Sequence, residues 1–274
     1  MLSLGERIAD SYAELSPQEQ RAADFLRDHL ADLAVYNATE VARLSGVSKA
    51  TISRLYRRLG FENAEQLRDH VRVVRASGIP VASDTPTSFP AHLDQEIGNL
   101  RAALEALAAA DLGVLSSVIA GARRVLVIGF RNSYPVALHL RQQLAQARDG
   151  VALAPQPGQS LGEELAGLTA DDTVILVGFR RRPETFGRVV AAAVESPARV
   201  ILMTDDGGRT HSAGADHTLI VPVDSVSAFD SYAAANSIVS LLASAVLGVN
   251  LREGRSRIAV IGEVYTALDE IEGA

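Results

Sequence analysis

The chain has 274 residues, a formal net charge of −7 and no cysteine. This length is enough for two domains that each bury their own core. The absence of cysteine excludes a disulfide framework, a thiolate zinc site and a cysteine nucleophile. The negative net charge argues against a protein that coats nucleic acid without specificity, and no apolar run is long enough to span a membrane.

The N-terminal part of the chain is predicted to be helical. Its first residues, Met1–Arg7, lack the basic stretch and apolar core of a secretory signal, so we expect a cytoplasmic protein. A first amphipathic helix is expected over residues 4–14. Ser16-Pro17-Gln18-Glu19 reads as a capping box with proline at the first helical position, which starts a second helix. Asn37 is expected to cap the next helix rather than to carry a glycan.

The stretch from Thr39 to Gly60 is predicted to form two short helices joined by a tight turn. Gly46 supplies the turn, and Ser48 is a natural N-cap for the second helix. Gly60 occupies the position after that helix, where the backbone enters the left-handed region. The apolar faces are expected to comprise Val41, Leu44, Ile52, Leu55 and Leu59. This is the layout of a helix-turn-helix, whose second helix enters the major groove of DNA.

The charge on this stretch is one-sided. Between Val41 and Phe61 there are five bases and no acid, and one of the bases, Lys49, is the chain's single lysine. Side chains near the start of the second helix would reach base edges, and arginines further along would meet phosphates. The candidate DNA-contacting residues are Ser48, Lys49, Thr51, Ser53, Arg54, Arg57 and Arg58. The alternative is an ordinary helical hairpin with a solvated basic face.

The remaining segments complete a two-domain organisation. A further helix is expected from Asn63, so that residues 1–77 form a five-helix DNA-binding domain. Residues 78–90, rich in proline, serine and threonine, are predicted to be a linker. Residues 91–274 are predicted to form a doubly wound α/β domain that binds the effector and oligomerises. Its five parallel strands are predicted from apolar runs at 125–128, 151–154, 173–177, 200–203 and 217–223.

Two of these predicted strands end in nearly the same sequence. Val125–Arg131 reads VLVIGFR, and Val174–Arg180 reads VILVGFR. Two similar strand–helix units are sufficient to explain the repeat. Alternatively, both strands end at one crevice and each delivers an arginine to it, because ligands of open α/β sheets bind outside the carboxyl ends of the strands.

The helical head, the linker and the five-stranded body together resemble the RpiR/MurR family of bacterial transcriptional regulators. The most specific parts are Thr39-Glu-Val-Ala42, Ser48-Lys-Ala-Thr-Ile-Ser-Arg54 and Leu59-Gly-Phe61. The second half resembles the SIS (sugar isomerase) domain of that family. The resemblance implies a homodimer or homotetramer that binds palindromic double-stranded operator DNA and responds to a phosphorylated sugar.

The stretch Gly178–Thr185 departs from the SIS pattern. SIS domains usually carry small hydroxyl residues after the third strand, which hold a sugar phosphate; here arginines replace them and Thr185 is kept. Arginine binds phosphate or carboxylate through two parallel hydrogen bonds. Alternatively, the loop arginines are solvated, or pair with Glu163, Glu164 or a partner subunit. We expect an anionic effector, a sugar phosphate or a carboxylate, bound by Arg131, Asn132, Ser133, Arg180, Arg181, Arg182 and Thr185.

Two functions of different classes fit these observations. The first is a ligand-responsive transcription factor, by default a repressor, in which the effector changes the spacing of two recognition helices. The second is a sugar-phosphate isomerase with a helical extension, which needs a Glu or His base. His139, His211 and His217 are scattered, and Glu184 is expected to be ion-paired, so we expect no enzyme. Neither metal-ligand spacing nor a dinucleotide-binding glycine motif is present, and we expect no metal or cofactor.

Overall fold

The computed structural model of the chain describes residues 4–29, 33, 36–76 and 88–271. The chain divides into two compact units, one of residues 1–92 with 225–230 and the other of residues 93–224 with 231–274. Most of the expected linker, residues 78–87, lies outside the described residues, as does residue 77 at the expected domain end. The last two residues of that linker, Phe89 and Pro90, already begin a helix. The linker and the domain boundaries therefore stay predictions.

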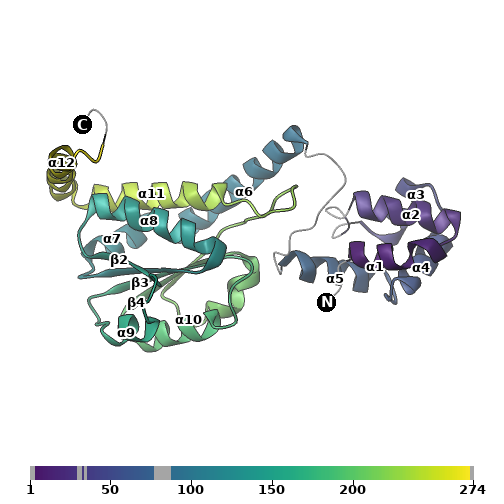
Figure 1. Ribbon diagram of the computed structural model, residues 1–274, viewed down its shortest axis with the longest axis horizontal. Helices are drawn as coiled ribbons and strands as arrows, with labels where there is room; N and C mark the ends of the chain where they lie inside the picture. The colour runs from purple at the N-terminus through teal and green to yellow at the C-terminus, as the bar shows by residue number, and fades with distance from the viewer. Residues whose placement is uncertain (1–3, 30–32, 34–35, 77–87, 272–274) are drawn as a thin grey trace. The chain divides into compact units, whose positions relative to one another are not determined.

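Before residue 77 the first unit contains five α-helices among its described residues, as predicted (Figure 1). They are α1 (Leu4–Ser11), α2 (Pro17–Asp28), α3 (Ala38–Ser45), α4 (Lys49–Arg58) and α5 (Ala64–Ala76), with a short 3-10 helix, η1 (Tyr12–Glu14), after α1. Each helix turns an apolar stripe inward, because burying that stripe is what stabilises helices this short. The resulting core includes Leu26 from α2, Leu55 from α4 and Leu67 from α5.

Side-chain caps start α2 and α3 where the sequence predicts them. The backbone N–H of Ser16 donates to Glu19 Oε2 at 3.0 Å, as in a capping box. Asn37 Oδ1 accepts from the backbone N–H groups of Thr39 and Glu40 at 2.9 and 3.1 Å. Such caps satisfy amides that have no partner within the helix and contribute about 1 kcal/mol each. The prediction of Asn37 as a helix cap is confirmed.

Glycine in the left-handed region ends both helices of the helix-turn-helix. Gly46 has φ +69° and Gly60 has φ +84°, as the sequence pattern predicts. After α4 the backbone N–H of Gly60 donates to the Arg57 carbonyl at 3.1 Å, and that of Phe61 donates to the Tyr56 carbonyl at 2.8 Å. This pair of bonds is a Schellman cap, which stops the helix and turns the chain.

One residue assigned to the apolar face of α3 lies on the surface instead. Leu44 is 42% exposed, whereas Val41, Ala42 and Ser45 are buried. At roughly 100° per residue, the buried face is centred close to the direction of Ser45, and Leu44 projects about 100° away from that centre. The prediction that Leu44 packs in the core is therefore wrong.

The second unit is built on a five-stranded, all-parallel sheet, as predicted. The strands lie in the order β2-β1-β3-β4-β5. Their bounds are β1 (Val125–Gly129), β2 (Val151–Ala154), β3 (Thr173–Gly178), β4 (Arg199–Thr204) and β5 (His217–Ile220). The fifth strand ends at Ile220 rather than at Val223. Because all strands are parallel, their carboxyl ends lie along one edge of the sheet.

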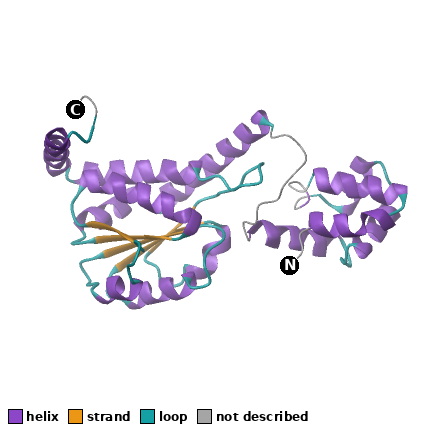
Figure 2. Ribbon diagram, viewed as in Figure 1, coloured by secondary structure: helices purple, strands orange, loops and turns teal. Residues whose placement is uncertain are grey.

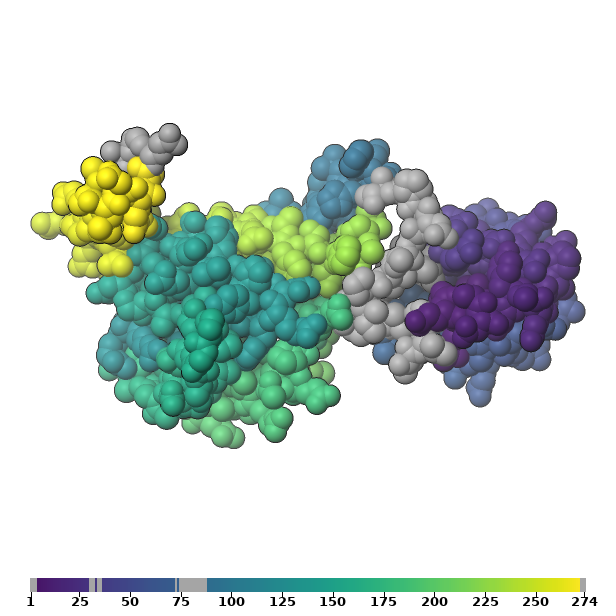
Figure 3. Space-filling model, in the orientation of Figure 1, coloured from purple at the N-terminus to yellow at the C-terminus, as the bar shows by residue number. Residues whose placement is uncertain are grey.

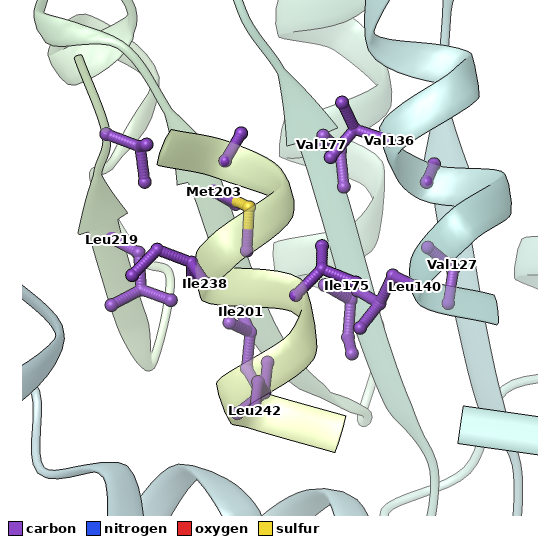
Figure 4. Close-up of a cluster of buried hydrophobic side chains, with 14 of the residues drawn as sticks. Val127, Val136, Leu140, Ile175, Val177, Ile201, Met203, Leu219, Ile238 and Leu242 are labelled. Carbon is purple, nitrogen blue, oxygen red and sulfur yellow. The ribbon is translucent and has the colours of Figure 1, made fainter. Parts of the chain in front are cut away.

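Helices cover both faces of this sheet (Figure 2). They are α6 (Phe89–Ala109, part of this unit from residue 93), α7 (Leu112–Gly121), α8 (Tyr134–Ala147), α9 (Leu161–Ala166), α10 (Phe186–Glu195) and α11 (Ala233–Val249). Alternate strand residues point to opposite faces. Ile175 and Met203 lie in the cluster that includes Leu140 of α8 and Ile238 of α11 (Figure 4), whereas Leu176 packs in a second cluster with α10.

The chain continues into α12 (Leu251–Leu268), a helix that the sequence patterns did not predict. It lies on the surface of the second unit (Figure 3), and among its residues only Gly254 is buried. No single described helix is long and apolar enough to cross a membrane. Two bent helix pairs, α6 with α7 and α11 with α12, would be long and apolar enough when each pair is taken together, on length and composition alone. Within the described ranges, no group of three or more His, Asp or Glu residues could hold a metal ion.

Candidate nucleic-acid interface and anion site

Helix α4 presents one apolar side and one basic side. Ile52, Leu55 and Tyr56 are buried in the core of the first unit. The opposite side is exposed, and its polar residues are Lys49, Ser53, Arg54, Arg57 and Arg58. At about 100° per residue, Arg54 and Arg57 lie near the middle of this outer side, and Arg58 lies at its flank. With Ser48, six of the seven predicted DNA-contacting residues are at the surface.

Thr51 departs from the prediction. Its side chain is 5% exposed, and its Oγ1 lies 2.9 Å from Ser48 Oγ, which also accepts from the Thr51 backbone N–H at 3.1 Å. Both hydroxyls therefore hold the start of α4. We reassign Thr51 from a base-contacting residue to a capping residue. Its position three residues after the N-cap is the sequence signal for that role.

The three arginines of α4 differ in how the first unit holds them. Arg58 Nη1 donates to the Glu14 carbonyl at 2.8 Å, and Arg58 Nε lies 3.6 Å from the buried carboxylate of Glu19. Hydrogen bonds from Ser16 lower the pKa of the Glu19 carboxyl group, and the nearby charge of Arg58 lowers it further. Arg58 thus links α4 to the segment around Glu14 and Glu19 of the same unit. Arg54 and Arg57 lie near the middle of the exposed side of α4.

In the second unit, the two loops that follow the repeated strand sequence begin side by side. β1 and β3 are neighbours, with Gly129 opposite Val177. Each loop holds an exposed arginine in the left-handed region, Arg131 with φ +49° and Arg181 with φ +59°. A non-glycine residue there costs on the order of 1 kcal/mol, and such strain clusters at ligand-binding loops.

Ser133 ties these two loops together. It ends a short 3-10 helix, η3 (Arg131–Ser133), and its side chain is buried. Ser133 Oγ accepts from the backbone N–H of Phe179, in the loop after β3, at 2.9 Å. We therefore reassign Ser133 from a direct effector contact to a residue that positions both loops.

Arg180 and Arg182 are ion-paired, but not with the acids of α9 that the sequence suggested. Arg182 pairs with Asp205, and its Nη1 also donates to the Gly178 carbonyl at 3.0 Å. Arg180 Nη2 lies 2.5 Å from Asp224 Oδ1, and its Nε lies 3.9 Å from Asp205 Oδ2. These pairs connect the carboxyl ends of β3, β4 and β5.

Sequence reasoning missed the role of Asp224. The available signal was an acid directly after the fifth predicted strand, since carboxyl ends of parallel strands share one edge. Asp205 also caps the turn that follows β4, since its Oδ2 accepts from the Gly207 backbone N–H at 3.2 Å. The α9 acid Glu164 pairs instead with Arg124, on the opposite edge of the sheet.

His211 is the histidine nearest to this site. Its ring packs edge-on against Phe186, with centroids 5.5 Å apart. Burial lowers the pKa of His211, and the charge of Arg182 lowers it further, so both favour the neutral imidazole. His139 lies within α8, His217 opens β5 at the other edge of the sheet, and the side chain of Glu184 is exposed.

Comparison with known families matches each unit separately. Residues 2–74 match the rpiR-family helix-turn-helix domain, and residues 118–249 match the SIS domain. The chain is of the RpiR type. It joins a DNA-binding module of that family to a sugar-isomerase-like domain.

Solved structures with the fold of this RpiR-type chain include two regulators. The sugar isomerase domain of an RpiR transcription factor from Sphaerobacter thermophilus is 26% identical, with a TM-score of 0.55, over 65% of this chain and 98% of that one. The Vibrio vulnificus NanR protein, complexed with ManNAc-6P, is 16% identical, with a TM-score of 0.52, over 97% of this chain and 99% of that one.

Curated relatives are longer proteins. The bifunctional protein glk of Paraburkholderia xenovorans is 26% identical over 207 residues, which are 73% of this chain and 32% of that protein. The corresponding protein of Burkholderia orbicola matches to the same extent. The RpiR-type chain therefore spans about a third of the length of the curated relatives it matches.

The predicted effector residues that this RpiR-type chain leaves exposed lie on the two tied loops. They are Arg131, Asn132, Arg181 and Thr185. Helices α8 and α10 begin directly after these loops. Guanidinium groups and the free amides at helix starts both favour negative charge. The arrangement is suited to an anion, with Arg180 as a further guanidinium that already has a carboxylate partner.

Proposed function

We propose that the chain is a sequence-specific, DNA-binding transcriptional regulator, a repressor in the cytoplasm, that acts as a homodimer or homotetramer under the control of an anionic metabolite. The observation that carries the proposal is the outer side of α4, where basic side chains stand opposite the buried face of an rpiR-family helix-turn-helix. In such a motif the second helix enters the major groove and its exposed side chains read the bases.

We assign the exposed arginines of α4 to two kinds of DNA contact according to their position along the helix. Arg54, near the middle of the exposed side, is assigned to a guanine edge, which arginine recognises through two hydrogen bonds. Arg57, one turn further on, is assigned to the phosphate backbone. Its Nε donates to the Ser53 carbonyl at 3.2 Å and leaves the rest of the guanidinium toward solvent. Two copies of α4 would meet half-sites about one turn of DNA apart, or a multiple of that distance.

Arg54→Ala is expected to lower the preference for the operator over random DNA by about 10- to 100-fold, because one bidentate base contact is worth roughly 1–3 kcal/mol. Arg57→Ala is expected to weaken binding to both DNAs equally and to reduce the salt slope by about one. Operators selected from random DNA by the wild-type protein would serve in competition titrations at several salt concentrations. Arg255→Ala, which removes an exposed charge on α12, is the matched control.

The base-reading assignment has a clear contrary result. If Arg54→Ala kept the operator preference while Arg57→Ala lost it, the two roles would have to be exchanged. If neither variant differed from Arg255→Ala, α4 would not be the helix that contacts DNA.

We assign the effector to the loops after β1 and β3, held by Arg131, Asn132, Arg181 and Thr185. A sugar phosphate is the first ligand class to test, because NanR, of the same fold, was solved with ManNAc-6P; a carboxylate remains the second. A bound effector controls DNA binding only if its affinity differs between two arrangements of the subunits. The required difference is typically 1–3 kcal/mol.

A thermal-shift screen against sugar phosphates, sugar acids and dicarboxylates tests this site. A ligand at 100 times its dissociation constant stabilises the native state by about 2.7 kcal/mol, so a binder raises the melting temperature. We expect Arg131→Ala and Arg181→Ala each to reduce that shift. Arg199→Ala, at the opposite edge of the sheet, should leave it unchanged. A shift of equal size in all three variants would place the ligand elsewhere.

The same ligands separate binding from turnover. We propose that the protein binds a sugar phosphate without converting it, and expect each ligand to be recovered unchanged by NMR. The isomerase alternative predicts aldose–ketose conversion by a positioned base. His211, which packs against Phe186 near Arg182, is the candidate for that base, so conversion that disappeared in His211→Asn would favour the enzyme.

A further inference from the structure

The two ion pairs at the strand ends are unequal in burial. In the Arg182–Asp205 pair, the side chains are 14% and 4% exposed. In the Arg180–Asp224 pair, Arg180 is 15% exposed but Asp224 is 48% exposed. An exposed carboxylate gains little from its partner, commonly 0–1 kcal/mol, because water solvates it almost as well. Removing the partner of a buried carboxylate destabilises the folded protein by several kcal/mol. A ligand anion could therefore replace Asp224 as the partner of Arg180 at little cost, whereas replacing Asp205 as the partner of Arg182 would be costly.

Arg180 belongs to one of the two loops that form the proposed anion site. It is the residue before Arg181, and the residue before it, Phe179, is bonded to Ser133 of the neighbouring loop. The Arg180 side chain is 15% exposed and pairs with the more exposed Asp224, so an anion that takes the place of that carboxylate gains the guanidinium as its partner. A phosphate carries more charge and more acceptor oxygens than a carboxylate, and it matches the guanidinium fork equally well.

Asp224 is also joined to α6. Its backbone carbonyl accepts from Asn99 Nδ2 at 2.7 Å, and Gln95 Nε2 donates to Asn99 Oδ1 at 3.0 Å. Asn99 is buried, so breaking the bond to Asp224 without a replacement would leave its amide group unsatisfied. The position of Asp224 is thereby coupled to α6, the helix on which the chain enters the second unit.

We infer that the effector anion displaces the Asp224 carboxylate from Arg180, and that the released Asp224 loosens its hydrogen bond to Asn99 and so signals to α6. The inference rests on the proposed anion site and adds its regulation. Arg180 has an anionic partner in both states, so the exchange leaves no buried charge unpaired. The ligand-free state is the one in which the chain's own carboxylate occupies the anion position.

Asp224→Asn in the full-length chain tests the exchange. This variant keeps the backbone carbonyl and the side-chain shape but removes the competing charge. Asp206→Asn is the control, because Asp206 is an exposed acid after β4 that pairs with Arg209 in its own turn. The probes are inorganic phosphate and ManNAc-6P, titrated calorimetrically at constant ionic strength. We expect the D224N variant to bind them at least about fivefold more tightly than the wild type, and the D206N variant to match the wild type.

Amide hydrogen exchange tests the signal without requiring any ligand. In the D224N variant we expect exchange across residues 95–103 of α6 to be at least about threefold faster than in the wild type. We expect D206N to leave it unchanged. Unchanged exchange in D224N would overturn the link to α6.

The titrations distinguish the possible failures. Equal affinity of the wild type and D224N for a probe would overturn the displacement while the proposed anion site stood. If neither the wild type nor D224N bound a probe, both the phosphate-binding site and the displacement of Asp224 would be overturned. Faster exchange in the D206N control as well would assign the effect to general charge loss and would also overturn the inference.

Discussion

Arg182→Met is expected to destabilise the SIS domain by about 3–5 kcal/mol, because it leaves a buried carboxylate without its charged partner. Asp205 is 4% exposed and pairs with Arg182, which also donates to the Gly178 carbonyl at 3.0 Å. Methionine fills a similar volume but offers neither charge nor hydrogen bond. Urea unfolding of the variant and the wild type, with the m-values compared, measures the loss.

Arg181→Met is the matched control for this experiment. Arg181 precedes Arg182 in the same loop, and its side chain is exposed. We expect its replacement to change the free energy of unfolding by no more than about 0.5 kcal/mol, as is usual for surface sites. Removing Asp205 as well, in Arg182→Met with Asp205→Asn, should recover part of the loss. Equal, small effects of both single variants would show that the buried pair contributes little.

Gly178→Ala is expected to destabilise the same domain by about 3 kcal/mol, at the upper end of the usual cost of overpacking a core. Gly178 ends β3, and a Cβ atom built on it would lie 2.0 Å from Cζ of Phe186 at the start of α10. Phe186 is itself buried and cannot move aside freely. Thermal and urea unfolding measure the loss of stability.

A double-mutant cycle identifies the cause of that loss. Phe186→Leu shortens the opposing side chain, so Gly178→Ala should cost at least 1 kcal/mol less in that background than in the wild type. Gly167→Ala is the control, since a Cβ there meets no atom within 4 Å. A cost of Gly178→Ala that was unaffected by Phe186→Leu would contradict the steric explanation.

The helix-turn-helix could be predicted nearly complete because its signals are local. An N-cap such as Ser48 and a left-handed glycine such as Gly46 act through bonds to residues two to five positions away. Spacing alone did not decide which side of a short helix faces inward. Leu44 and Thr51 were misplaced because the neighbouring helices determine the centre of the buried face.

The residues of the proposed anion site were predicted only in part. The repeated strand sequence correctly placed two loops at one edge of the sheet, and four of the seven effector residues are exposed there. The partners of Arg180 and Arg182 could not be predicted. Asp205 and Asp224 come from other strand ends, 23 and 44 positions away from the arginines they pair with.

The sequence by itself determined the secondary-structure elements of this protein. Capping residues and the helical periodicity of apolar residues predicted the helices, and apolar runs predicted the strands. The charge pattern predicted the basic side of α4. These are short-range consequences of backbone geometry and side-chain type. Only the tertiary structure decided which polar groups are paired and which remain open to a ligand. Parallel strands bring together residues that are far apart in the chain, and burial then makes an unpaired charge too costly to leave at that edge.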